Sequence, residues 1–179
     1  TLFRSAYRDR SSGGWPFSTR AHGWPISDCT AEGLKASLLL GPFVAHPIPA
    51  ERLTEATDLL LAMQNVDGGW ATYERTRGPA WLERLNPSDC FADIMIDPSY
   101  VECTSASMQA LAAFRARYPG TRDVAIDAAI ARGRDFLLGA QRQDGSWEGS
   151  WGICFTYGAW FGTWGLRAAG LAADHPAML

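Results

Sequence analysis

The sequence predicts an all-α protein, and three observations support that fold class. Apolar residues recur at helical spacing in five stretches, the alternation typical of strands is weak, and one motif at a helix end occurs twice. With 179 residues, of which 47% are hydrophobic, the chain is long enough for one domain with a sizeable core. Because it begins with Thr1 rather than Met, we expect residues 1–179 to be a single partial domain of a longer protein.

Each expected helix carries a row of apolar side chains on one face. In chain order, the helices start near residue 29, surround 53–63, cover about 100–117, surround 126–137 and cover about 156–170. Loops rich in Gly, Pro and Asp separate them at 11–27, 65–99 and 142–153. The loop at 65–99 is long for a structureless connection, and "PAWLERL" at 79–85 is a candidate for a short helix within it.

The repeated motif reads "LLLAMQNVDGGW" at 59–70 and "FLLGAQRQDGSW" at 136–147, 77 residues later. The equivalent positions are Gln64 with Gln141 and Trp70 with Trp147. Asp-Gly favours a tight turn that folds the Trp back over the Gln and the helix end, where the Gln amide can bond exposed backbone groups. We interpret these four residues as clamps that tie helices together. The stretch "SSGGWPFS" at 11–18 has the Gly-Trp end of a third copy without its Gln.

Composition excludes several classes of function. The net charge is −3 and no basic run occurs, so a nucleic-acid partner is not expected. No apolar stretch reaches about 18 residues, and no signal peptide is visible. The cysteines lack CxxC spacing, which predicts free thiols and no zinc site. They are Cys29, Cys90, Cys103 and Cys154. Lys35 is the only lysine beside many arginines, a weak hint of a GC-rich bacterial source.

The stretch "HGWPISDCTAEG" at 22–33 places a carboxyl group, Asp28, beside a thiol and directly before a helix. Asp is a favoured N-cap residue, so spacing alone favours a capping role over a chemical one. The chain is also rich in aromatic residues, with 8 Trp, 8 Phe and 5 Tyr, many of them beside glycine in turn-like segments. A helical-repeat scaffold without catalytic activity would explain the clamps, but it gives no reason for this acid and thiol beside aromatic loops.

These motifs resemble the oxidosqualene cyclase family. The Gln-to-Trp repeats resemble the QW motifs of triterpene cyclases, and "SDCTAE" at 27–32 resembles the catalytic-acid motif of oxidosqualene cyclases. "YVECTSA" at 100–106 and "GSWEGSWGICFTYGAWFG" at 145–162 are also similar, so the resemblance runs from about residue 7 to 170. Related squalene–hopene cyclases carry a DxDD-type motif where this chain has Ile-Ser-Asp-Cys at 26–29, which favours an epoxide substrate over squalene.

The resemblance implies a fold and a reaction. Family members contain two α/α-barrel domains and protonate 2,3-oxidosqualene, which then closes into fused rings through carbocations. This chain would be the central part of the catalytic α/α-barrel domain, inactive without the rest. No metal or organic cofactor is implied. Peripheral, monotopic attachment to the cytoplasmic face of a membrane is expected, because the substrate is a long isoprenoid lipid.

The resemblance also assigns roles to residues of the acid motif. Asp28 would be the proton donor, with the thiols of Cys29 and Cys103 as its hydrogen-bond partners. A buried carboxyl group stays protonated because desolvation disfavours its charged form, and hydrogen bonds that strengthen as it ionises keep it acidic. The alternative role for the two cysteines is buried apolar packing.

Aromatic residues would stabilise the cations by cation–π attraction, worth about 2 kcal/mol or more for each desolvated ring. By resemblance, the rings that face the cations are Phe17, Tyr73 and Trp151, and Phe91 and Ile94 shape the cavity. The alternative for all five residues is ordinary core packing.

Two further residues bear on the product. The His and Ile at His22 and Ile26 resemble cycloartenol synthases more than lanosterol synthases, and they would influence where the last proton leaves. The alternative for His22 is a structural, hydrogen-bonded histidine. The sequence "TRAH" at 19–22 lacks the Asp that the family usually places before this His, so lanosterol or another triterpene stays an alternative product.

Overall fold

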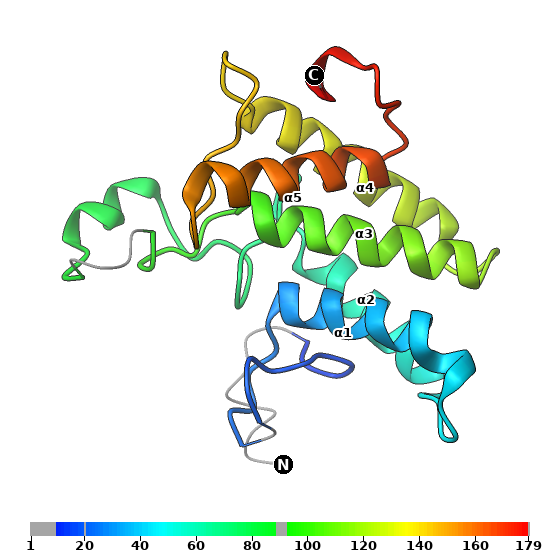
Figure 1. Ribbon diagram of the computed structural model, residues 1–179. Helices are drawn as coiled ribbons and strands as arrows, with labels where there is room; N and C mark the ends of the chain where they lie inside the picture. Colours follow the sequence, from blue (N-terminus) through cyan, green and yellow to red (C-terminus); the bar gives the residue numbers. More distant parts are fainter. Residues whose placement is uncertain (1–9, 20, 89–92, 179) are drawn as a thin grey trace.

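The computed structural model describes residues 10–19, 21–88 and 93–178 (Figure 1). The α-helices are α1 (Ser27–Leu40), α2 (Ala50–Met63), α3 (Val101–Arg117), α4 (Asp123–Ala140) and α5 (Cys154–Ala168). The short 3₁₀ helices are η2 (Gly41–Phe43), η3 (Ala80–Leu85) and η4 (Pro176–Met178). Across these residues β-structure is limited to isolated bridges, so the predicted all-α class is confirmed. Within the same ranges, every helix is too short or too polar to cross a bilayer.

The helices form two layers. Figure 1 shows α1, α3 and α5 side by side with α3 in the middle, while α2 and α4 pack against them as a second layer. All three front helices begin at the same side of the molecule. The first half of the middle helix is therefore covered on all sides: its first eight residues, 101–108, are buried, whereas 115–117 at its end are exposed. This burial explains why α3 shows little sequence amphipathicity, since a helix enclosed by neighbours needs no polar face.

The polar residues of α3 are satisfied by neighbouring segments. Thr104 Oγ1 accepts the backbone N–H of Trp70 at 2.9 Å, and Ser105 Oγ donates to the carbonyl of Phe161 at 2.5 Å. Buried hydroxyl groups require such partners. They attach the loop after α2 and the middle of α5 to the central helix.

Helix α1 begins earlier than the sequence predicts. Its first residue, Ser27, donates its N–H to the carbonyl of Thr72 at 2.8 Å and its hydroxyl to that of Ala71 at 2.5 Å. The cap position belongs to Ile26, so the expectation that Asp28 could be the N-cap is wrong. Asp28 lies inside the first turn instead. The contacts that fix this boundary come from a loop more than forty residues away, which local spacing cannot reveal.

The two repeated motifs form the same hydrogen bonds. The indole N–H of Trp70 donates to the carbonyl of Leu60 at 2.7 Å, and that of Trp147 donates to the carbonyl of Leu137 at 2.8 Å. Both carbonyls lie in the last turn of a helix, where no intrahelical partner is available. The turn glycines, Gly68 and Gly145, have φ of +92° and +83°. The predicted return of the Trp to the helix end is therefore present in both copies.

The glutamines extend each clamp to the next segment. Gln64 donates to the carbonyl of Gly68 at 2.8 Å and to that of Ala129 in α4 at 2.9 Å, while Arg132 donates to its carbonyl oxygen. Gln141 donates to Gly145 at 2.9 Å and to Ala177 in η4 at 3.0 Å. The partial third copy places Trp15 against α1, where a Cβ at Gly33 would come within 2.9 Å of its ring.

Candidate active site

Figure 1 shows that the N-terminal ends of α1, α3 and α5 lie at the same side of the molecule. A cavity of about 580 Å³ is lined by residues at these three helix starts and in the neighbouring loops. Its lining combines aromatic, aliphatic and a few polar side chains. The lining residues are Phe17, Ile26, Asp28, Thr72, Tyr73, Arg77, Ile94, Asp97, Tyr100, Trp151 and Tyr157. A mostly apolar concavity with few polar groups is typical of a small-molecule site.

The cavity brings together several of the residues that the sequence singles out. Six of them line it: Phe17, Ile26, Asp28, Tyr73, Ile94 and Trp151. Cys29, Cys103 and His22 are absent from the lining, and Phe91 lies outside the described residues. The convergence joins segments that are more than 130 residues apart in the chain, as far as Phe17 is from Trp151.

Asp28 sits half-buried in the first turn of α1. Burial raises the pKa of its carboxyl group, and the backbone N–H and thiol of Cys29 partly oppose that rise. The N–H of Cys29 donates to Asp28 Oδ1 at 2.7 Å. The positive end of the helix dipole also favours negative charge at this position. The site therefore holds a carboxyl group that is protonated more readily than usual, with donors ready to stabilise its anion.

Both neighbouring thiols keep their protons. Burial, followed by the charge of Asp28, raises the pKa of Cys29 to about 11. Burial likewise raises the pKa of the fully buried Cys103 well above the ordinary thiol value, and the charge of Asp28 contributes. Thr72 Oγ1 lies 3.9 Å from Cys103 Sγ. Cys29 thus contacts the acid directly, whereas Cys103 lies next to Thr72 and feels the charge of Asp28 only through space.

His22 and Ile26 are placed differently from each other. Ile26 is 1% exposed and forms part of the cavity wall directly before the acid. His22 is exposed, and its backbone N–H donates to the carbonyl of Thr19 at 2.9 Å. A role for His22 in the chemistry stays a prediction.

The aromatic side chains lie at different depths. Trp151 is half-buried, and its ring lies 4.9 Å from the ring of Tyr100 at an angle of 43°. Tyr73 and Phe17 lie at the open side, with exposed fractions of 39% and 74%. The deep side of the cavity is thus shaped by paired rings, while the mouth is lined by single ones.

Sequence reasoning missed two of the aromatic residues in the wall. Tyr100 occupies the N-cap position of α3 and Tyr157 lies in the first turn of α5. Both fall inside the motifs that carry the family resemblance, "YVECTSA" and "GSWEGSWGICFTYGAWFG". The available signal was their position: like Asp28, each stands at the start of a front-layer helix.

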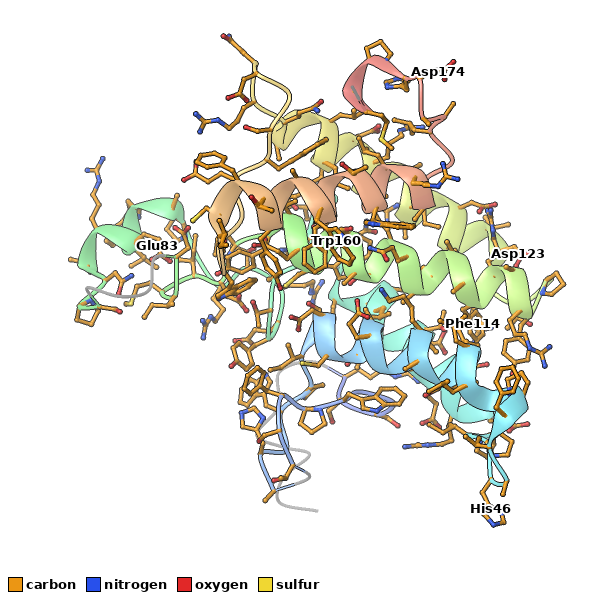
Figure 2. All side chains as sticks on the ribbon, viewed as in Figure 1. His46, Glu83, Phe114, Asp123, Trp160 and Asp174 are labelled. Carbon is orange, nitrogen blue, oxygen red and sulfur yellow. The ribbon has the colours of Figure 1, made fainter. Side chains whose placement is uncertain are left out.

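The cavity wall at Ile94 is fixed by Glu83, a residue of η3 that is labelled in Figure 2. Glu83 Oε1 accepts the backbone N–H groups of Met95 and Ile96, each at 2.8 Å. The guanidinium of Arg77 donates to the carbonyl of Ile94 at 3.2 Å. Two side chains therefore hold the backbone on which Ile94 stands.

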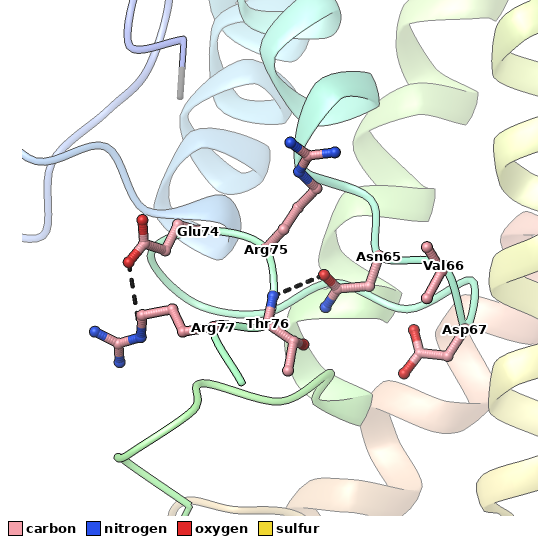
Figure 3. Close-up of a pocket in the computed structure, with 7 residues that line it drawn as sticks. All are labelled: Asn65, Val66, Asp67, Glu74, Arg75, Thr76 and Arg77. Atoms are coloured by element: carbon pink, nitrogen blue, oxygen red, sulfur yellow. Dashed lines mark hydrogen bonds and ion pairs between the residues drawn. The ribbon is translucent and has the colours of Figure 1, made fainter. Parts of the chain in front are cut away.

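A second cavity of about 560 Å³ borders the loop at 74–77, and the chemical character of its lining is different (Figure 3). Its lining, residues 65–67 and 74–77, is largely charged or polar, and Arg77 lines both cavities. A charged lining suits water rather than an apolar ligand. Among the residues that the structure describes, no group of three or more His, Cys, Asp or Glu side chains could hold a metal ion.

Comparison with known proteins places the chain in a family. Residues 3–179 match the squalene-hopene cyclase C-terminal domain. The chain is 56% identical to the cycloartenol synthase of Dictyostelium discoideum over 176 residues, which are 97% of this chain and 25% of that protein. It is 55% identical to the lanosterol synthase of Mus musculus over 159 residues, 87% of this chain and 22% of that protein. The chain therefore spans about a quarter of the length of the curated relatives it matches.

The fold also has a counterpart of known structure. The type II terpene cyclase MstE from Scytonema superposes with a TM-score of 0.56 at 22% identity, over 98% of this chain and 44% of that one. At this identity the likeness concerns the fold alone. The two sequence relatives come from eukaryotes, and the bacterial source hinted at by composition stays a prediction. Because the family match covers nearly the whole chain, the chain belongs to the oxidosqualene cyclase family and forms part of its squalene-hopene cyclase C-terminal domain.

Proposed function

We propose that this chain is the central part of the catalytic α/α-barrel domain of an enzyme that cyclises 2,3-oxidosqualene. One observation carries the proposal: Asp28, whose pKa burial raises, opens into a cavity lined by aromatic rings. A scaffold without catalytic activity has no use for a half-buried carboxyl group that opens into such a cavity. The relatives are about four times longer than this chain, so the chain by itself is expected to be inactive.

The reaction begins with transfer of the Asp28 proton to the epoxide oxygen. As the C–O bond breaks, the oxygen becomes a hydroxyl group and the ring carbon becomes electron-deficient. The electrons of the nearest double bond then form the first ring bond. Asp28 is left as a carboxylate, which the N–H of Cys29 already contacts at 2.7 Å. A hydrogen bond that strengthens as the acid ionises lowers the barrier to proton transfer.

The later cations require stabilisation without a nucleophile. An aromatic face attracts a cation through its quadrupole, at about 2 kcal/mol or more when water is excluded. Tyr73, Tyr100 and Trp151 line the cavity and serve this purpose, with Phe17 at its mouth. A base supplied by another part of the enzyme takes up the final proton, so the net reaction is an isomerisation.

For the product, we propose cycloartenol. The pair His22 and Ile26 supports it, together with the 56% identity to a cycloartenol synthase. Lanosterol is the alternative, supported by 55% identity to a lanosterol synthase. Product analysis of the full-length enzyme distinguishes them, and lanosterol without cycloartenol would reject the first choice.

Peripheral membrane association belongs to the same proposal, because the substrate is a lipid. A flotation assay of the full-length protein with phosphatidylcholine vesicles tests it. Co-flotation at low and at high salt is expected for apolar attachment, and protein that stays in the bottom fraction would contradict it.

The proton-donor role is tested by Asp28→Asn in the full-length enzyme. The variant should lose cyclisation by a factor on the order of 10³ or more, because the amide cannot donate a proton of comparable acidity. Asp144→Asn is the matched control, since Asp144 is an exposed turn residue whose Oδ1 accepts the N–H of Ser146 at 3.0 Å. Near-normal turnover by Asp28→Asn would reject the assigned role.

A further inference from the structure

Two buried carboxyl groups near the cavity have no part in the proton transfer. We infer that Asp97 and Glu102 are positioning residues that hold the backbone of the loops carrying Tyr73 and Trp151, and so set where these two rings stand. The inference rests on the proposed function in one respect only, that the rings act on a substrate in this cavity.

Asp97 holds the first loop by its main chain. Its Oδ1 accepts the N–H of Thr72 at 3.0 Å, and its Oδ2 accepts those of Tyr73 and Glu74 at 2.7 and 3.4 Å. The side chain is 3% exposed. Its own φ is +51°, a left-handed conformation that costs energy for residues with a Cβ. Asp97 thus binds three consecutive backbone N–H groups of this loop while its own backbone is strained, so we infer that holding the loop is its role.

The far end of the same loop is also fixed (Figure 3). The N–H of Thr76 donates to Asn65 Oδ1 at 2.9 Å, and the N–H of Arg77 donates to the carbonyl of Ile96 at 2.8 Å. The guanidinium of Arg77 and the carboxylate of Glu74 lie 3.6 Å apart. The loop therefore forms a firm wall between the polar cavity and the aromatic one, and Tyr73 projects from its middle.

Glu102 holds the second loop in a similar manner. Its Oε1 accepts the N–H of Ser150 at 2.5 Å and that of Trp151 at 3.3 Å, and the side chain is 2% exposed. A Cβ at Gly149 would come within 2.7 Å of the same oxygen, so the loop lies directly on the carboxyl group. Among the described residues, its Oε2 has no hydrogen-bond partner.

The sequence around Glu102 parallels that around the acid. Asp28-Cys29-Thr30 and Glu102-Cys103-Thr104 occupy the first turns of α1 and α3. Both threonines accept the backbone N–H of a tryptophan, Trp15 in one case and Trp70 in the other. Of the two carboxyl groups, only Asp28 lines the cavity, while Glu102 is covered by the loop of Trp151. The same three-residue pattern thus supplies the proposed proton donor in α1 and a carboxyl group that supports a loop in α3.

The hydrogen bonds that hold the loop also keep Asp97 from reacting with the carbocations. A carboxylate that lines a cavity containing carbocations would trap or deprotonate them. The oxygens of Asp97 accept three backbone N–H groups, so their lone pairs are directed at the loop rather than at a cation in the cavity. The two loops gain rigidity, and the cavity loses a competing nucleophile.

The two sites predict opposite responses to an amide substitution. Glu102 uses one oxygen, so Glu102→Gln keeps an acceptor for both N–H groups, with its NH₂ in the place of Oε2. Burial raises the pKa of Glu102, which makes the neutral amide a closer substitute. Asp97 uses both oxygens, so Asp97→Asn turns an NH₂ group toward at least one N–H donor. Glu102→Leu removes both bonds at its site.

Hydrogen exchange of the full-length protein measures the loops directly, whether or not the enzyme cyclises anything. Glu102→Leu should speed exchange in peptides that cover 148–152 by about tenfold or more, and Asp97→Asn should do so for 72–77. Glu102→Gln and the control Asp144→Asn should leave both regions unchanged. If Glu102→Leu does not fold, Gly149→Ala replaces it, because its Cβ pushes the same loop away from an intact Glu102.

Product analysis with 2,3-oxidosqualene then tests the effect on the rings. Loosened rings should raise the share of incompletely cyclised products in Glu102→Leu and Asp97→Asn, with Glu102→Gln close to wild type. Equal damage from Glu102→Gln and Glu102→Leu would overturn the inference, since charge rather than hydrogen-bond acceptance would then matter. Unchanged loop exchange in Glu102→Leu and Asp97→Asn would overturn it as well. Failure of the wild type to cyclise the substrate would count against the proposed function alone.

Discussion

The two clamp glutamines occupy equivalent positions in the repeated motif but differ in burial, so one substitution made at both sites should give different costs. We consider Gln64→Leu and Gln141→Leu, which keep the approximate side-chain size and remove the amide. Gln64 is buried and joins α2 to the middle of α4. Gln141 is half-buried and joins the end of α4 to the exposed Gly145 and to η4.

The magnitudes follow from the bonds that are lost. Gln64 donates two buried N–H···O bonds of 2.8 and 2.9 Å, and a neutral buried hydrogen bond contributes about 1 kcal/mol. Arg132, which donates to its carbonyl oxygen, is exposed and can bond water instead. Leaving the Gly68 carbonyl without a partner costs up to about 2 kcal/mol more. We therefore expect Gln64→Leu to destabilise the protein by about 2–4 kcal/mol. Water can replace the partners of Gln141, so Gln141→Leu should cost about 1 kcal/mol or less.

Urea denaturation of the two full-length variants, followed side by side with wild type, gives the comparison through the shift in midpoint. The expected order is a large shift for Gln64→Leu and a small one for Gln141→Leu. Equal shifts, or a larger one for Gln141→Leu, would refute the argument that burial decides the strength of each clamp.

Three other expectations can be checked on the same full-length protein. Gly133→Ala should destabilise the protein by about 1–3 kcal/mol in urea denaturation, because the new Cβ would lie 2.7 Å from the sulfur of Met108. Gly139→Ala on the same helix is the control: its Cβ meets nothing within 4 Å, so it should stabilise the protein by about 0.5–1 kcal/mol. Cys29→Ala removes a thiol that lowers the pKa of Asp28, so the loss of cyclisation with rising pH should move to higher pH. Because burial raises the pKa of Asp28, the folded protein keeps a proton that the unfolded chain releases, and stability falls as pH rises above the ordinary aspartate pKa. Asp28→Asn should therefore raise the urea midpoint at pH 7, with the gain vanishing in acid; an unchanged midpoint would contradict the burial argument.

Much of the fold could be predicted because apolar residues recur at helical spacing on the face of the helix that is buried. The apolar rows of α2 and α4, such as Ile126, Ile130 and Leu137, are buried as expected. The turn chemistry of Asp-Gly predicted where Trp70 and Trp147 return to their helices, since that contact spans only ten residues. Local patterns of this kind are readable without knowledge of tertiary structure.

What the sequence could not predict depends on distant partners. The start of α1 is set by bonds from Ser27 to the loop at 71–72. The importance of Glu102 was invisible because the residues around it at the start of the helix are mostly small or polar, and its burial comes from the neighbouring helices α1, α4 and α5. Tyr100 and Tyr157 became wall residues only when three helix starts met at one side of the molecule. Family resemblance supplied several residues of the cavity, and geometry supplied the residues that support them.

The loops of Tyr73 and Trp151 are held through main-chain amides, which every residue except proline possesses. An exchange of the ring at either position therefore leaves the support intact, and the cavity can acquire a new shape through a single codon change. The carboxyl groups that accept these amides have less freedom, since we expect a replacement without the same acceptor atoms to release a loop. Such a division between interchangeable lining and fixed support would let the shape of the cavity change in small steps while the fold stays the same.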